Sequence, residues 1–190
     1  MMLNTSSNGK PLNRGPWDSA DLHAPKDLVN FGSVLFVPNP SVGVRADIEE
    51  LSQKVVAISF DYKESVLQVQ AFASSKGSAL WDEVVEDIFT NLTSQNLITE
   101  KASGPYGVEI HAELPTSNEK TQKVRMFGFT GDRWLLRGTI SGAAISDPEQ
   151  RAELEDVFRG LVVNRGETPL PPREILPLEL PTGSIVTRVK

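Results

Sequence analysis

The chain has 190 residues, a formal net charge of -6 and no cysteine. Its length suits one domain with a substantial hydrophobic core, and is too short for two domains of ordinary size once the polar ends are discounted. The negative charge argues against a general nucleic-acid or acidic-membrane surface, because phosphate binding needs a positive field, and the missing cysteines exclude disulfides, thiolate metal sites and a cysteine nucleophile.

The two ends differ in composition from the middle of the chain. Residues 1–16 are rich in Asn, Ser, Gly and Pro and have almost nothing to bury, so we predict a flexible N-terminal arm. Residues 166–190 contain five prolines, which predicts a proline-rich tail that lies extended over the surface or stays mobile. We expect one domain over residues 17–165. No apolar segment resembles a secretory signal or a membrane span, so we expect a cytoplasmic location.

The first half of this domain has the alternation typical of β-strands. Strands are predicted at 34–37, 42–47, 54–61 and 66–73. A four-residue connection at 62–65 suits a hairpin between the last two. In the last strand, Leu67, Val69 and Ala71 point to one side, so we expect them in the core.

Two segments have the periodicity of amphipathic helices. Residues 79–95 and 148–159 carry apolar side chains at the i, i+3, i+4 spacing of a single stripe. Ser78 is predicted to cap the first helix. Asp147 is predicted to cap the second, with proline at the first helical position and Gln150 closing a capping box.

Residues 97–103 and 108–114 are predicted to form a further hairpin that turns through 104–107. One face of its second strand carries Glu109, His111 and Glu113. Such side chains start about 6.5 to 7 Å apart, so they converge on a metal ion only with strong twist, and the usual second histidine is missing. We therefore predict no metal site, and expect a solvated outer face instead.

Residues 123–142 are predicted to form the tight hairpin around which the domain is organised. The dipeptide at 131–132, Gly-Asp, suits the positive φ of a two-residue turn. That turn sets Phe129 opposite Trp134. Both faces of the pair carry apolar side chains, which is typical of strands covered on both sides, so we expect these strands to be central.

The predicted elements together indicate an α+β fold. We expect a meandering, mostly antiparallel sheet of about six to eight strands. The two main helices are expected to pack on it in a sandwich-like arrangement.

No group of residues commits the chain to a reaction. The carboxylates of the first helix lie on its exposed side, neither histidine stands in a serine-elbow context, and no glycine-rich phosphate loop occurs. We therefore predict no catalytic residue and no cofactor. The candidate residues for binding a ligand or partner are Trp81, Arg125, Arg133, Trp134 and Arg137. Arginine beside tryptophan can bind an anion; the alternative is that these arginines pair with the domain's own acidic residues.

Four stretches of the sequence, taken as a set, resemble a known family. They are LWDEV at 80–84, GPYG at 104–107, RWLLRG at 133–138 and PPREILPLELP at 171–181. They look like those of an uncharacterised family of actinobacterial proteins, a domain of unknown function, over about residues 15–181. The resemblance implies a bacterial cytoplasmic protein of unassigned role and supplies no catalytic residue. The order of elements is also similar to the antiparallel α/β/α sandwich of the photosystem II extrinsic oxygen-evolving subunit and the Ran-release factor, a likeness of fold that does not carry function.

The sequence supports two functional hypotheses. The first is a non-catalytic interaction module that binds a protein partner or forms a homo-oligomer. It rests on the lack of a recognisable site, on docking-type tails, and on candidate exposed aromatic residues at Trp17, Tyr106 and Trp134. The second is a binding pocket for a small anionic or lipophilic ligand, lined by Trp81, Arg125, Trp134 and Arg137. An enzyme is a third reading with no residue to support it, and neither nucleic acid nor membrane is an expected partner.

Overall fold

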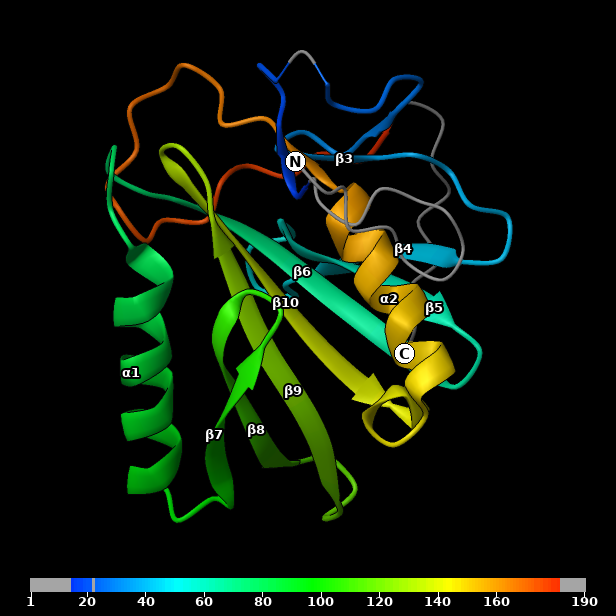
Figure 1. Ribbon diagram of the computed structural model, residues 1–190, viewed down its shortest axis with the longest axis vertical. Helices are drawn as coiled ribbons and strands as arrows, with labels where there is room; N and C mark the ends of the chain where they lie inside the picture. Colours follow the sequence, from blue (N-terminus) through cyan, green and yellow to red (C-terminus); the bar gives the residue numbers. More distant parts are fainter. Residues whose placement is uncertain (1–14, 22, 182–190) are drawn as a thin grey trace, which may run out of the picture.

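The computed structural model describes residues 15–21 and 23–181. Residues 1–14 of the predicted arm and 182–190 of the predicted tail lie outside the described residues, and the division into arm, domain and tail stays a prediction. The described chain forms a seven-stranded sheet, a smaller four-stranded sheet and two α-helices (Figure 1). This arrangement confirms the predicted α+β class with its mostly antiparallel sheet.

The large sheet is antiparallel throughout. In spatial order its strands are β4 (Gly43–Ile48), β5 (Val55–Tyr62), β6 (Ser65–Ala73), β10 (Trp134–Gly142), β9 (Thr121–Thr130), β8 (Gly107–Pro115) and β7 (Thr99–Gly104). The small sheet consists of β1 (Trp17–Asp18), β11 (Val162–Val163), β3 (Val34–Phe36) and β2 (Val29–Asn30). The helices are α1 (Leu80–Ser94) and α2 (Pro148–Gly160), and the short 3-10 helix η1 (Ala143–Ile145) precedes α2. None of the described helices is both long and apolar enough to cross a membrane.

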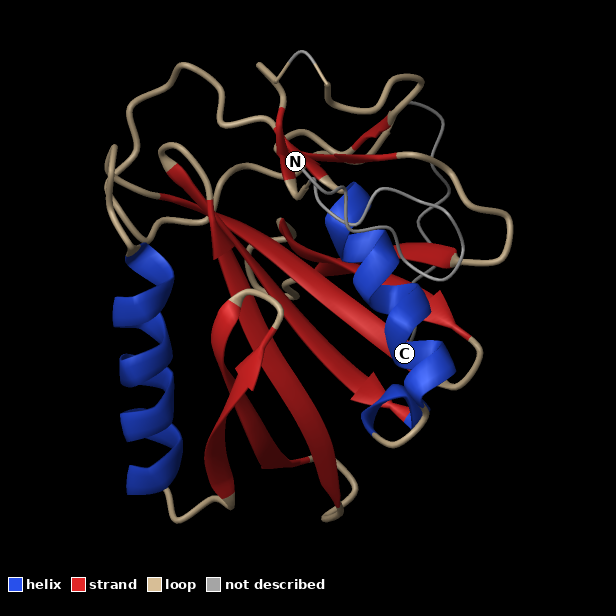
Figure 2. Cartoon of the chain, in the orientation of Figure 1, coloured by secondary structure: helices blue, strands red, loops and turns tan. Residues whose placement is uncertain are grey.

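The two α-helices pack on opposite faces and opposite halves of the large sheet. α1 contacts β7, β8 and β9, whereas α2 contacts β5, β6 and β10, and Figure 2 shows them on either side of the strands. Leu135 is buried beneath α1 with Trp81, and Leu136 beneath α2 with Phe158, because successive side chains of a strand point to opposite faces. Both faces of the central strands are therefore covered, as predicted. On the α2 side, Phe127 of β9 still packs against Phe158 of the helix, whereas β7 and β8 are not among the strands that α2 contacts.

α1 falls within one residue of its predicted bounds, but its predicted cap is wrong. Ala79 stands at the N-cap position and makes no side-chain cap hydrogen bond. The amide of Trp81 instead donates to the hydroxyl of Thr130 at 3.1 Å. A tertiary contact from the β9–β10 hairpin thus satisfies a first-turn amide and replaces the cap predicted at Ser78.

α2 begins as predicted. The carboxylate of Asp147 accepts hydrogen bonds from the amides of Glu149 and Gln150, and Pro148 is the first helical residue. The predicted capping box is wrong, because the buried Gln150 side chain accepts from the Ser65 hydroxyl at 2.7 Å and donates to the Asp147 carboxylate at 3.0 Å. Gln150 therefore ties α2 to the start of β6.

The β9–β10 hairpin differs from the prediction in its register. Phe129 lies opposite Leu136 and not opposite Trp134. The amide of Gly131 donates to the carbonyl oxygen of Trp134 at 2.9 Å, which leaves 132–133 as the loop. The indole of Trp134 lies across Gly131, where an added Cβ would be 2.2 Å from the ring, so glycine is needed there. A shift of two residues along one strand keeps every side chain on its predicted face.

The other two long hairpins are tighter than predicted. Tyr62 pairs with Ser65, and Gly104 pairs with Gly107, so each loop holds two residues. Lys63 adopts a φ of 51°, the left-handed conformation that two-residue hairpin loops require. The outer residues of the predicted connections at 62–65 and 104–107 therefore belong to the strands.

The C-terminal segment, residues 173–176, runs along the part of β6 that does not pair with β5. That pairing stops at Val69. The Leu176 amide then donates to the Ala71 carbonyl and the Ala73 amide to the Glu174 carbonyl, both at 2.8 Å. Leu176 is fully buried, so this part of the tail contributes to the core.

Candidate functional site

On the α2 side, β7, β8 and the N-terminal half of β9 carry polar side chains, whereas Phe127 and Phe129 further along β9 belong to the apolar core. The polar side chains are Glu100 on β7, Glu109, His111 and Glu113 on β8, and Lys123 and Arg125 on β9. A cavity of about 600 Å³ opens over them and is bounded on its far side by Ile145, Arg151 and Glu155. We call it the charged cavity.

Glu109 is buried, so the predicted solvated face is wrong at this residue. It is 3% exposed. Both carboxylate oxygens hold Arg125, with Nε to Oε1 at 2.7 Å and Nη2 to Oε2 at 2.9 Å. Gly104 makes room for this carboxylate, because an added Cβ there would lie 1.8 Å from Oε2. Strand alternation predicts which side chains share a face, but not what covers that face.

Arg125 connects the sheet to α2. Its Nη1 lies 2.5 Å from an oxygen of Glu155, so one guanidinium bridges two carboxylates. Arg125 is 7% exposed. The alternative reading of the arginines, pairing with the domain's own acids, therefore holds at Arg125.

The ion pair sets the protonation of both groups. Burial alone would raise the pKa of Glu109 and lower that of Arg125. Hydrogen bonds outweigh burial: Arg125 and His111 hold the pKa of Glu109 below its ordinary value, and Glu109 and Glu155 hold the pKa of Arg125 above its own. Both groups are therefore charged at neutral pH.

His111 links this pair to the outer strand. Its Nε2 lies 2.7 Å from Oε1 of Glu109, and its Nδ1 lies 3.6 Å from a carboxylate oxygen of Glu100. The register aligns Glu100, His111 and Arg125 in one row across three strands. Over the ranges that the structure covers, no three His, Cys, Asp or Glu side chains are grouped to hold a metal ion. His111 thus joins β8 to β7 through Glu100, and Glu109 joins β8 to β9 through Arg125.

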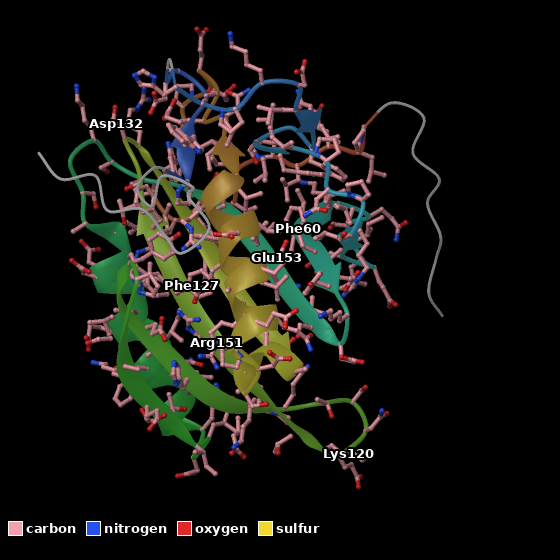
Figure 3. The ribbon with its side chains drawn as sticks, turned by 45° about the vertical axis from the view of Figure 1, so that its right-hand side comes forward. Phe60, Lys120, Phe127, Asp132, Arg151 and Glu153 are labelled. Atoms are coloured by element: carbon pink, nitrogen blue, oxygen red, sulfur yellow. The ribbon has the colours of Figure 1, made fainter. Side chains whose placement is uncertain are left out.

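The cations of the charged cavity already have acceptors. Besides Arg125, Arg151 projects from α2 (Figure 3) and donates to two carbonyl oxygens of η1, at 3.0 and 2.5 Å. Lys123 lies 3.7 Å from a carboxylate oxygen of Glu113. The side chain of Glu100, by contrast, is 75% exposed. The cavity therefore offers carboxylate oxygens to an incoming cation.

The structure separates the five predicted binding residues. Trp81 and Arg137 lie on the α1 side of the sheet, and Arg125 and Trp134 on the α2 side. Arg133 is exposed in the β9–β10 loop, with a φ of 66°. The pocket predicted from four of these residues does not form, because strand alternation directs them to opposite faces. Their roles in binding stay predictions.

Two of the predicted tryptophans are buried and hydrogen-bonded. The indole N–H of Trp81 donates to the carbonyl oxygen of Val108 at 2.8 Å, and that of Trp134 to a carboxylate oxygen of Asp18 at 2.7 Å. Trp81 is 3% exposed and Trp134 is 1% exposed. The prediction of an exposed aromatic surface at Trp134 is therefore wrong, and both rings are available to stabilise the fold rather than to meet a partner.

A family model described as "Protein of unknown function (DUF3710)" matches residues 15–185. The chain belongs to this family. No curated protein matches the chain in sequence. A solved structure similar to the DUF3710 chain is the solution structure of cyanobacterial PsbP (CyanoP) from Synechocystis sp. PCC 6803, with 13% identity and a TM-score of 0.41 over 78% of this chain and 99% of that one. The expected actinobacterial origin and cytoplasmic location stay predictions.

Sequence reasoning missed two acidic residues of the DUF3710 site, Glu100 and Glu155, and considered Glu109 only as a metal ligand. A signal for Glu109 was present, because pairing β8 with β9 puts it on the same face as Arg125, and a buried arginine needs a carboxylate. Glu155 left no such signal. Its contact with Arg125 depends on where α2 crosses the sheet, which is decided by packing.

Tyr106 is expected to show a shifted titration. Its ring packs against Phe127, Phe129 and Phe158, and its buried hydroxyl has no hydrogen-bond partner among the described residues. Burial raises the pKa of Tyr106 to about 12, although nearby Arg159 lowers it in part. Since the folded pKa lies above the unfolded one, this group's contribution to stability is complete below about pH 10 and is lost as the pH rises through 12.

The measurement for Tyr106 is tyrosinate absorbance against pH, which is simple because the chain has two tyrosines. We expect a step near pH 12 in the wild type. Tyr106→Phe should lack that step and keep the other. A wild-type titration completed near pH 10, with circular dichroism showing a folded chain, would contradict the burial of this hydroxyl.

Proposed function

We propose that the DUF3710 domain is a non-catalytic interaction module that binds an extended segment of a protein partner along β7, with a Lys or Arg of that segment in the charged cavity. The observation that carries the proposal is the position of β7 at the edge of the large sheet, beside that cavity. An edge strand with unpaired backbone groups is a template for an added strand.

The hydrogen-bond alternation shows which groups β7 offers. The amide of Glu113 donates to the carbonyl oxygen of Ile98 at 2.9 Å, so even-numbered residues of this strand bond to β8. Thr99, Lys101 and Ser103 therefore direct their amides and carbonyls outward. Within the described ranges, no backbone group bonds to them on that side. This outward row accepts a partner strand without disturbing the sheet.

The charges next to β7 favour a basic partner segment. The exposed carboxylate of Glu100 lies on the cavity side of this strand, and the cavity's own cations already have acceptors. A Lys or Arg on the same face of an added strand reaches Glu100 as a cross-strand neighbour. The net charge of -6 adds steering toward a basic segment.

The same charges disfavour two of the antiparallel registers in which β7 could pair with a second copy of itself. An antiparallel pair centred on Lys101 opposes two lysines, and one centred on Glu100 opposes two glutamates. Like charges directly opposite each other destabilise a strand pair. We therefore favour a different protein over a homo-oligomer as the partner.

The test is selection of peptides on the wild-type domain, followed by calorimetry of synthetic peptides. We expect enriched peptides to carry Lys or Arg in an alternating, extended pattern. Lys101→Pro removes one outward amide N–H and should weaken peptide binding at least about tenfold. Lys101→Ala removes only the side chain, keeps the amide N–H, and should leave peptide binding intact. Glu100→Gln should weaken binding about two- to fivefold and reduce its salt dependence.

Methylation of peptide amides gives a readout that does not depend on a variant folding. Methylation at alternate positions that face β7 should abolish binding, and methylation at the intervening positions should not. Selection of acidic peptides, or equal effects of methylation at both sets of positions, would refute the proposed mode of binding.

A further inference from the structure

A second cavity, of about 200 Å³, lies on the α1 side where α1, the large sheet and the C-terminal segment meet. Most of its lining is apolar: Phe72, Leu80, Val84, Ile88 and Leu135. The charged side chains that line it are Asp87, Arg137 and Arg173. We call it the Arg137 pocket.

Two of these three charges neutralise each other. Arg173 donates to Asp87 at 2.6 Å and also to Glu83 at 3.2 Å, and so fastens the C-terminal segment to α1. Arg137 forms no ion pair with any described residue, and its one hydrogen bond in the described structure goes to the side-chain oxygen of Gln70. A guanidinium has five N–H donors, so most donors of Arg137 have no described acceptor.

These donors remain accessible from the pocket. The buried side-chain polar atom without a partner in the described structure is the Tyr106 hydroxyl, so the unbonded nitrogens of Arg137 are not sealed in the core. The guanidinium lies over the Phe72 ring at 5.1 Å, a favourable cation–π contact. Burial, with no carboxylate of the described residues paired to it, nevertheless penalises the cation and lowers the pKa of Arg137. An anion bound in the adjoining pocket would compensate this charge.

We propose that the Arg137 pocket binds a small monocarboxylate with a short apolar body. The carboxylate accepts hydrogen bonds from the unbonded N–H groups of Arg137, the geometry in which arginine binds carboxylates best. The body packs against Leu80, Val84 and Leu135.

The volume sets the size of this ligand. At ~30 Å³ per water-sized group, 200 Å³ holds about seven such groups. Hexanoate, with eight non-hydrogen atoms, is close to this size and is the probe. Hexylamine, which also has six carbons but the opposite charge, is its matched control. Acetate lacks the apolar body and should bind more weakly than hexanoate.

The experiment is titration of wild-type protein with each probe, followed by calorimetry and by the NMR signal of the Arg137 Nε–H. We expect hexanoate to bind and to shift this signal, and hexylamine to do neither. Arg137→Met should lower the hexanoate affinity at least about tenfold. Lys120→Met, which removes an exposed cation that does not line the pocket, should leave that affinity unchanged.

Two results would overturn the inference. Equal binding of hexanoate and hexylamine would mean that the pocket recognises only apolar chains. Unchanged affinity in Arg137→Met would mean that the carboxylate does not meet this guanidinium. If Arg137→Met fails to fold, the Nε–H titration of the wild-type chain decides the matter, since an unshifted signal at saturating hexanoate refutes the contact.

Discussion

Replacing Arg125 with methionine is expected to lower the free energy of unfolding by about 3 to 5 kcal/mol. The substitution leaves the buried carboxylate of Glu109 without its two hydrogen bonds from the guanidinium, and removes the contact between β9 and Glu155 of α2. Removing one partner of a buried ion pair costs more than the pair contributes, because the remaining charge stays desolvated. Urea denaturation at pH 7 measures this loss.

Lys123→Met is the matched control, since Lys123 stands two residues away on the same strand face and also pairs with a glutamate, at 3.7 Å. Its side chain is 69% exposed, so we expect a loss below about 1 kcal/mol. Equal losses in the two variants would contradict the buried character of the Arg125 pair.

The Arg125 pair also predicts a pH dependence. The lowered pKa of Glu109 means that its stabilisation is present above the unfolded value, about 4.3, and is lost as the pH falls through the folded value. The difference between wild type and Arg125→Met should therefore shrink in acid, because protonation removes the uncompensated charge. A difference that stays constant from pH 7 to pH 3 would contradict this assignment.

Replacing Trp81 with alanine is expected to cost about 3 to 5 kcal/mol of stability. The ring is 3% exposed in the α1-side core, and it lies against Gly128, where an added Cβ would be 2.4 Å from Cε3 of the indole. The substitution removes this packing and leaves the hydrogen bond to the Val108 carbonyl unmade. Chemical denaturation gives the magnitude, and a loss below about 1 kcal/mol would mean that the ring is not core.

A double-mutant cycle tests the contact itself. Gly128→Ala alone should destabilise the domain, because its new methyl group collides with the indole. In the Trp81→Ala background the same methyl group enters vacated space, so its cost should largely disappear. Additive losses would show that Gly128 is needed for a reason other than Trp81.

The two proposed binding surfaces lie on opposite faces of the sheet, so their tests are independent. Lys101→Pro alters the edge beside the charged cavity, and Arg137→Met alters the pocket beneath α1. Each variant should leave the other ligand's affinity unchanged. Loss of both peptide and hexanoate binding in one variant would indicate general unfolding, which a melting curve of that variant detects.

Local pattern in the sequence was enough for most of the fold. Apolar spacing located α1 and α2 within one residue of their observed limits, and Asp147 followed by proline marked the start of the second. Strand alternation placed Leu67, Val69 and Ala71 in the core, where all are fully buried. These features depend on residues close together in the chain, whose geometry is set by helix and strand periodicity.

Tertiary structure alone decided the sites. Strand alternation showed which side chains share a face of the sheet with Glu109 or Arg125. Whether that face is exposed to solvent depends on which half of the sheet each helix covers. Packing placed α2 so that Glu155 reaches Arg125. It also placed α1 and the C-terminal segment around a pocket that Arg137 lines, where this arginine forms no ion pair with a described residue. Burial and charge compensation are sums over segments far apart in the chain, and therefore no local pattern specifies them.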